Sequence, residues 1–345
     1  MGQPVINTEK HILCFGEILL RMSPAADWPH DSVLQTYVGG AEANVAFALA
    51  AWKVPVKYCT AMPRNFLSEK ITAYLQEKKI DTSAVINSGS RVGLYYLHAG
   101  ADLKSAGVIY DRANASFAEM KTFTIDWEEK LKDVSHIHFT AISPAVSASA
   151  AEVCEELLIA AKQKNITVSL DLNYREKLWQ YGKQPVVIMP GLARYCDVIM
   201  GNIWSANKML GIELDQNINS FSKQEEFLTE ANRVSEKIME QYPQCSLVVN
   251  TFRFNLENDA VRYFATIRDK EQFVFSKERT CTAIVDKAGS GDCFMAAVLY
   301  SLYNSRSLQE TVDFASAAAT GKLYETGDHT GQTIEAVEQR VNAHR

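Results

Sequence analysis

The stretch Asp286-Lys287-Ala288-Gly289-Ser290-Gly291-Asp292 runs directly into the apolar segment 293–299. A glycine-rich turn that opens a helix leaves several backbone N–H groups unpaired and directed at one point, which attracts anions. Asp292 places a carboxylate where an anion should bind, so we interpret it as a base. It would take a proton from a hydroxyl that attacks a phosphoryl group held over the turn. The alternative is an ordinary glycine-rich loop in which an aspartate caps the helix, and the heptapeptide alone leaves both open.

Composition limits the kinds of protein that this chain can be. Its 345 residues suit one large α/β domain with a smaller attached element, or two domains. The net charge of −6 argues against nucleic acid or an anionic membrane as the main partner. Seven scattered cysteines without a C-x-x-C pair indicate reduced thiols. Because neither a signal-peptide pattern nor an apolar stretch of membrane-spanning length is present, we expect a soluble cytoplasmic protein.

Apolar strand-like runs alternate with amphipathic helical runs along most of the chain. We expect strands at about 11–20, 56–62, 137–142, 166–171, 197–200 and 246–251, and helices at about 41–52, 66–79, 147–164, 205–210, 223–241, 291–303 and 308–324. This alternation predicts an α/β fold with a doubly wound, mostly parallel sheet flanked by helices. In such sheets ligands bind at the carboxyl ends of the strands, so chemistry should be sought there.

Two further segments follow the predicted strands or open the predicted helices. Gly39-Gly40-Ala41-Glu42-Ala43-Asn44 brings paired glycines to a helix start, where a ligand can approach the backbone, although a plain helix-entry turn would look the same. The segment 171–175, Asp-Leu-Asn-Tyr-Arg, follows a strand directly. Arg175 there suits a carboxylate or phosphate, and the alternative is an internal salt bridge.

A short strand pair interrupts the alternation at 91–98 and 106–112, with a hairpin-like signal at Gly100-Ala101-Asp102. It carries Tyr95, Tyr110 and Arg112. If this element covers the site, it acts as a lid that excludes water; it could also be an oligomerisation sheet, and both can hold.

Other motifs are absent or weak. No G-x-x-x-x-G-K-[ST] segment occurs, and no G-x-G-x-x-G follows the first strand, which argues against P-loop and dinucleotide enzymes. His136 and His138 alternate on a strand-like run without a ligand-type partner nearby, so a plain strand is favoured over a metal site.

The early Gly39-Gly40-x-x-x-Asn44 and the late Asp286…Gly289-Ser290-Gly291-Asp292 together resemble the two signatures of the ribokinase-like (PfkB) carbohydrate kinases, in order and spacing, over nearly the whole chain. Further segments resemble the 2-keto-3-deoxygluconate kinases of that family: Gly93-Leu94-Tyr95, Tyr110-x-Arg112, Asp171–Arg175 with Leu178-Trp179, and Gly327-Asp328-His329. Two features depart from the family pattern. Lys287 stands where threonine is common, and 250–255 lacks the usual glycine.

The resemblance implies one kinase domain over 1–345, with a β lid contributed by about 16–40 and 91–113. Asp292 would be the base, and the amides of Ala288, Gly289, Ser290 and Gly291 would form an anion hole. The implied sugar contacts are Gly40, Asn44, Tyr95, Tyr110, Arg112 and Arg175, and the implied nucleotide contacts are Asn173, Asn202, Thr251, Gly289 and Gly291. It further implies ATP with Mg²⁺, a monovalent cation as a candidate cofactor, no assigned metal ligand in the protein, and a homo-oligomer, either a dimer through the β lid or a higher assembly.

Two arginines directed at the acceptor would favour a sugar acid over a neutral sugar, because a neutral sugar offers guanidinium groups no partner. We therefore expect transfer of the ATP γ-phosphoryl group to the terminal hydroxyl of 2-keto-3-deoxygluconate or a close analogue. The competing hypotheses are a fructokinase or ribokinase, and a non-catalytic sugar-sensing protein on the same fold.

Overall fold

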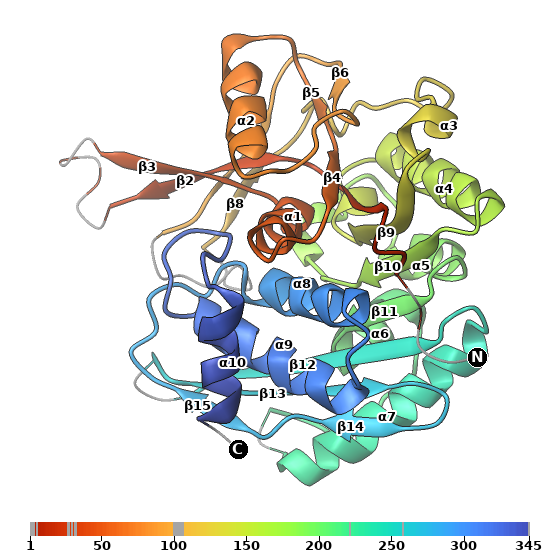
Figure 1. Cartoon of the computed structure of the whole chain (residues 1–345), viewed down its shortest axis with the longest axis vertical. Coiled ribbons are helices and arrows are strands. Elements are labelled where there is room, and N and C mark those ends of the chain that lie inside the picture. The colour runs from red at the N-terminus through yellow and green to blue at the C-terminus, as the bar shows by residue number, and fades with distance from the viewer. Residues whose placement is uncertain are drawn as a thin grey trace.

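The computed structural model describes residues 4, 6–25, 28, 30, 33–98, 107–220, 222–256 and 259–343. Its main sheet has the strand order β14-β13-β12-β11-β10-β9-β1-β4, with β15 paired to β13 (Figure 1). The bounds of these strands are β1 His11–Phe15, β4 Val56–Cys59, β9 Val134–Thr140, β10 Thr167–Asp171, β11 Val198–Gly201, β12 Leu247–Asn255, β13 Val261–Arg268, β14 Phe273–Phe275 and β15 Arg279–Cys281. Neighbours from β12 to β4 pair in parallel, and β13 to β15 continue the sheet in antiparallel pairs.

Helices cover both faces of this sheet, which confirms the predicted doubly wound architecture. They are α1 Ala41–Ala51, α2 Phe66–Glu77, α3 Trp127–Lys130, α4 Ala148–Gln163, α5 Pro185–Ala193, α6 Ile203–Leu210, α7 Gln224–Gln241, α8 Ser290–Tyr303, α9 Leu308–Lys322 and α10 Ile334–Asn342. Alternate residues of one strand enter different cores, as strand geometry requires. Ile12 of β1 packs into the core with α1, α8 and α9, and Leu13 packs into the core with α4 to α7.

A second, four-stranded sheet has the order β3-β2-β7-β8, with bounds β2 Leu19–Pro24, β3 Leu34–Gly39, β7 Gly93–Tyr96 and β8 Ile109–Asp111. Figure 1 shows β2 and β3 extending away from the main body. The predicted strand pair is β7 and β8, which run antiparallel with Tyr95 opposite Tyr110. The hairpin signal at 100–102 lies outside the described residues. A third, two-stranded sheet pairs β5 Ala61–Met62 with β6 Ile86–Asn87.

Two predicted strands were wrong in extent. The run 56–62 is divided between β4 in the main sheet and β5 in the two-stranded sheet. The run 11–20 is divided between β1 in the main sheet and β2 in the small sheet. The chain turns at Gly16, where a Cβ atom would lie 2.1 Å from a carboxylate oxygen of Glu42, so a side chain would have no room.

The glycine-free stretch 250–255 has a structural explanation. It is the second half of β12 and pairs with β13 from Asn250 opposite Thr266 to Asn255 opposite Val261. Because these residues form a ladder and not a loop, glycine would weaken the segment. Strands β13 to β15 fall in a part of the chain for which the sequence analysis assigned no element.

Candidate active site

The glycine-rich turn lies at the start of α8, as predicted. Gly289 is the N-cap residue and has φ 73°, a left-handed conformation that favours glycine. A Cβ atom on Gly289 would lie 1.7 Å from the carbonyl oxygen of Asp328, so the turn touches the 325–328 loop directly. Within the described residues, the amides of Gly289, Ser290 and Gly291 donate no hydrogen bond to another backbone group. These three N–H groups are therefore available to an anion.

Ala288 differs from the expectation that four amides form the anion hole. Its N–H donates to Asp286 Oδ1 over 3.0 Å. This is the two-residue side-chain-to-backbone bond typical of an Asx turn, and it uses the donor internally. Ala288 therefore shapes the turn, and only the next three amides remain open.

Asp292 lies in the first turn of the apolar helix α8 and is almost fully buried, with 8% of its surface exposed. Asn44 Nδ2, from the first turn of α1, donates to Asp292 Oδ2 over 2.7 Å. The pKa of Asp292 is raised to about 7, mainly by burial, and the charge of Asp171 acts in the same direction. The hydrogen bond from Asn44 and the charge of Arg175 act in the opposite direction and lower the pKa. A carboxyl group with this pKa can gain or lose a proton at neutral pH, as a general base requires.

Two cavities meet at Asp292. The first, which we call the acceptor pocket, is lined by Glu17, Leu19, Gly40, Ala41, Glu42, Asn44, Tyr95, Tyr110, Arg112, Ile142, Asn173, Arg175 and Asp292. The second, the turn pocket, is lined by Asp171, Asn173, Tyr174, Arg175, Met200, Gly201, Asn202, Ser205, Thr251, Arg253, Tyr263, Lys287, Gly289, Ser290, Gly291 and Asp292. Asn173, Arg175 and Asp292 belong to both. The structure thus brings the expected sugar contacts into one cavity and the expected nucleotide contacts into the other.

The two arginines of the acceptor pocket have different partners. Arg112 is buried and forms an ion pair of 2.6 Å with the buried carboxylate of Glu17, so its charge is neutralised within the protein. Arg175 donates to the carbonyl of Tyr174 over 3.2 Å and forms no ion pair within the described part of the chain. Arg175 is therefore the guanidinium of this cavity whose charge remains available to a ligand.

The turn pocket lies where the parallel strands end. Asp171 closes β10, Gly201 closes β11, and Asn202 caps α6 by accepting from the amide of Ser205 over 2.8 Å. Lys287 also lines this pocket, and its ammonium donates to Asn255 Oδ1, outside the pocket lining, over 3.1 Å. The lysine that departs from the family pattern is thus a positively charged residue beside the turn whose amides are open.

A buried charge network joins the small sheet to the turn. Arg21 of β2 lies 2.8 Å from Asp286 Oδ2 and 3.4 Å from Asp328 Oδ1. The hydroxyl of Tyr95 donates to Asp328 over 2.6 Å. Sequence reasoning missed Arg21 and Glu17, because their partners are far away in the chain. Asp328 could be singled out only as part of the family-like segment Gly327-Asp328-His329.

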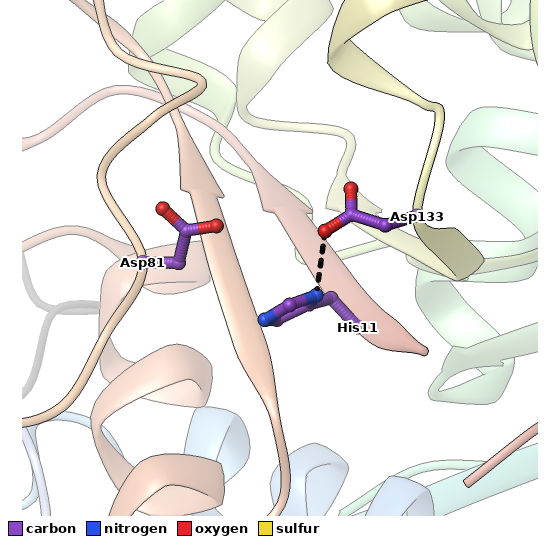
Figure 2. A group of neighbouring side chains, drawn as sticks. All are labelled: His11, Asp81 and Asp133. Carbon is purple, nitrogen blue, oxygen red and sulfur yellow. Dashed lines mark ion pairs between the residues drawn. The ribbon is translucent and has the colours of Figure 1, made fainter. Parts of the chain in front are cut away.

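Two other groups of metal-ligand-type residues have structural explanations. His136 and His138 both share hydrogen bonds with Ser169 Oγ, at 2.8 and 3.0 Å, inside the core. His11, Asp81 and Asp133 gather at the amino ends of the strands, the edge opposite the turn, with His11 and Asp133 2.9 Å apart (Figure 2). Lys57 bonds to Asp133 and lies 3.6 Å from Asp81, so a lysine already supplies the positive charge there.

Comparisons with known proteins agree with this geometry. The model of the pfkB family of carbohydrate kinases matches residues 9–334. A 2-dehydro-3-deoxygalactonokinase of Haloferax volcanii is 26% identical over 95% of each chain. The solved 2-dehydro-3-deoxygluconokinase of Thermotoga maritima is 29% identical, with a TM-score of 0.86 over 96% of this chain and 99% of that one. A candidate ribokinase II of E. coli, solved in complex with ATP and Mg²⁺, shares the fold at 17% identity and a TM-score of 0.73, over 97% of this chain and 100% of that one. Among the described residues, no helix is long and apolar enough to cross a membrane.

Proposed function

Since the chain belongs to the pfkB family of carbohydrate kinases, we propose that it transfers the γ-phosphoryl group of ATP to the terminal hydroxyl of a 2-keto-3-deoxy sugar acid, with Asp292 as the general base. The observation that carries the choice of a sugar acid is Arg175. It lines the acceptor pocket beside Asp292, and no carboxylate of the described chain forms an ion pair with it. A guanidinium left in this state suits a bidentate carboxylate partner.

In this proposal the acceptor sugar lies in the acceptor pocket with its reactive hydroxyl at Asp292. Gly40, Asn44, Tyr95, Tyr110 and Arg112 would surround the rest of the sugar. Gly40 has φ 127°, and a Cβ atom there would lie 2.4 Å from the carbonyl oxygen of Glu17, so a side chain would have no room at this position. Asn44 would hold the Asp292 carboxylate in place, because one of its amide hydrogens is already used for that.

The nucleotide would enter the turn pocket. The amides of Gly289, Ser290 and Gly291 would stabilise charge that develops on the transferred phosphoryl group. Asn173, Asn202 and Thr251 would line the path of the remaining phosphates. Mg²⁺ prefers oxygen ligands and phosphate, and the buried Asp171 carboxylate on this wall suits it. When bound, the ion would neutralise phosphate charge.

The names of the relatives support this substrate class. The kinases from Haloferax volcanii and Thermotoga maritima are named for 2-dehydro-3-deoxy sugar acids that differ in the stereochemistry of the sugar. Identities of 26% and 29% support the class without selecting the epimer.

A substrate panel with coupled detection of ADP tests the proposal. 2-Keto-3-deoxygluconate and its galactonate epimer should be turned over with a much higher kcat/KM than fructose or ribose. Efficient turnover of the neutral sugars instead would favour the fructokinase or ribokinase hypothesis, and no sugar-dependent ADP release would favour a non-catalytic sugar sensor.

Arg175→Ala tests the carboxylate clamp. It should weaken the binding of sugar acids by about 10²-fold, because a charge-assisted bidentate contact contributes about 1.5–3 kcal/mol, and should change the binding of neutral sugars little. Arg194→Ala is the matched control, since Arg194 is an exposed arginine paired with Glu155. Equal losses for acids and neutral sugars would show that Arg175 is not the clamp.

A further inference from the structure

Lys322, the last residue of α9, is fully buried. Its ammonium donates to the backbone carbonyl of Gly327 over 2.9 Å and to that of Glu325 over 3.1 Å. Only two lysines of the described chain are buried; the other, Lys57, is 5% exposed and is paired with carboxylates at the far edge of the sheet. A buried charge is costly unless it is well bonded, so the position of Lys322 calls for an explanation.

The carbonyls that hold Lys322 belong to the loop that supports the glycine-rich turn. The amide of Gly327 donates to Asp286 Oδ2 over 3.3 Å, and Asp286 in turn accepts from Ala288 through its other oxygen. The amides of Val285 and Asp286 both donate to the carbonyl of Leu323, the residue after Lys322, over 2.8 and 3.2 Å. A continuous set of hydrogen bonds therefore runs from the ammonium to the turn.

The electrostatic surroundings explain why a cation is stable here. Asp286, Asp328 and Glu325 all act on Lys322 and favour its charged form, against burial, which lowers its pKa. Arg21 contacts Asp286 and Asp328 directly, whereas Lys322 is bonded to backbone carbonyls and acts on these carboxylates through its charge. With one cation fewer, buried carboxylates would remain insufficiently compensated next to a turn that must attract an anion.

We propose that the ammonium of Lys322 is the fixed cation of this loop: it positions the glycine-rich turn, so that the kinase requires no monovalent metal ion. Backbone carbonyl oxygens can replace the hydration shell of K⁺, as they do in the selectivity filters of K⁺ channels. Here two such oxygens are already bonded to a side-chain ammonium, which does not fit a monovalent cation as a resident cofactor of this loop. Lys322 is thus a positioning residue that touches neither substrate. The inference rests on the proposed role of the turn in phosphoryl transfer.

The first test uses the unmodified enzyme with its preferred sugar. Turnover should be the same in choline, sodium, potassium and ammonium chloride at constant ionic strength. Strong activation by K⁺ would overturn the proposal, and this test does not depend on the folding of a variant. If no sugar is turned over in any salt, the proposed function fails and not the role of Lys322.

The second test removes the ammonium. Lys322→Ala should lose at least about tenfold in kcat in choline chloride, because hydrogen bonds to a charged group are worth about 1.5–3 kcal/mol. K⁺ or NH₄⁺ should restore part of that loss by occupying the vacated carbonyls. Lys57→Ala is the matched control: it removes a buried lysine and should lower stability without making turnover depend on the cation.

A folded Lys322→Ala protein with full turnover in choline chloride would overturn the proposal, and so would a loss that no monovalent cation reduces. Should Lys322→Ala fail to fold, Lys322→Arg keeps the charge. Turnover by Lys322→Arg should be the same whichever monovalent cation is present in the buffer. Turnover by that variant that depends on K⁺ would contradict the inference.

Discussion

Replacing the buried carboxyl group with an amide, Asp292→Asn, should lower the activity of the protein and raise its stability. The pKa of Asp292 is about 7 in the folded protein and about 3.9 in an unfolded chain. Between these values the folded state holds a proton that the unfolded state has released, so stability falls as pH rises. A difference of about three pKa units corresponds to about 4 kcal/mol, reached at and above about pH 7.

The variant lacks this penalty and keeps an oxygen that can accept from Asn44. Asp292→Asn should therefore match the unmodified protein in unfolding free energy near about pH 4 and exceed it by about 2–4 kcal/mol above about pH 7. In the same protein, loss of the base should lower kcat by about 10²–10⁴-fold while sugar binding persists.

Urea unfolding between about pH 4 and 9 measures the first effect, and coupled ADP detection measures the second. Glu240→Gln is the control, because Glu240 is an exposed carboxylate paired with Lys237 on α7; its stability difference should be small and flat with pH. A stability difference for Asp292→Asn that does not change with pH would refute the reasoning about burial. Near-normal turnover would refute the assignment of the base.

Three further outcomes are expected. Gly289→Ala should lose turnover and several kcal/mol of stability, because the new Cβ would meet the backbone of Asp328. The control is Gly182→Ala, which is also at positive φ but has no atom within 4 Å of the new Cβ. It should cost only about 1–2 kcal/mol in thermal unfolding. Lys287→Thr should raise the KM for ATP and leave the KM for the sugar unchanged in steady-state kinetics, since Lys287 lines the turn pocket and not the acceptor pocket. An effect on the KM for the sugar alone would contradict this. Burial lowers the pKa of His138 to about 3, so the free energy of unfolding should fall in acid, by about 2 kcal/mol at pH 5 for this one histidine. His138→Gln should reduce the dependence of the unfolding free energy on pH in urea titrations, and an unchanged dependence would argue against a buried neutral histidine.

The turn and the strand–helix alternation could be predicted because both depend on local patterns. Periodicity located α1, α4 and α8 to within a residue or two, and the glycines of the heptapeptide determine how α8 starts. The role of Ala288 was also locally encoded, since Asp286 two residues earlier is a typical Asx-turn residue. That correction required only a closer interpretation of the same seven residues.

The pairing of charges could not be predicted in this way. Glu17 neutralises Arg112 across 95 positions of sequence, and Arg21 contacts Asp286 across 265. Each partner alone resembles an ordinary polar residue in a strand or loop, so nothing in the sequence distinguishes a neutralised arginine from an available one. For the same reason Lys322 carried no signal, because a lysine at the end of a helix is normally solvated.

Arg175 connects substrate charge to the strength of the base. Its guanidinium lowers the pKa of Asp292, against burial and the charge of Asp171, which raise it. A sugar carboxylate bound to Arg175 would offset that guanidinium and raise the pKa of the base, whereas a neutral sugar would leave it unchanged. A stronger base takes the hydroxyl proton more readily, at the cost of being ionised in a smaller fraction of molecules at neutral pH. The arginine that we propose as the carboxylate clamp therefore also makes the pKa of the same base, Asp292, higher with a bound sugar acid than with a bound neutral sugar.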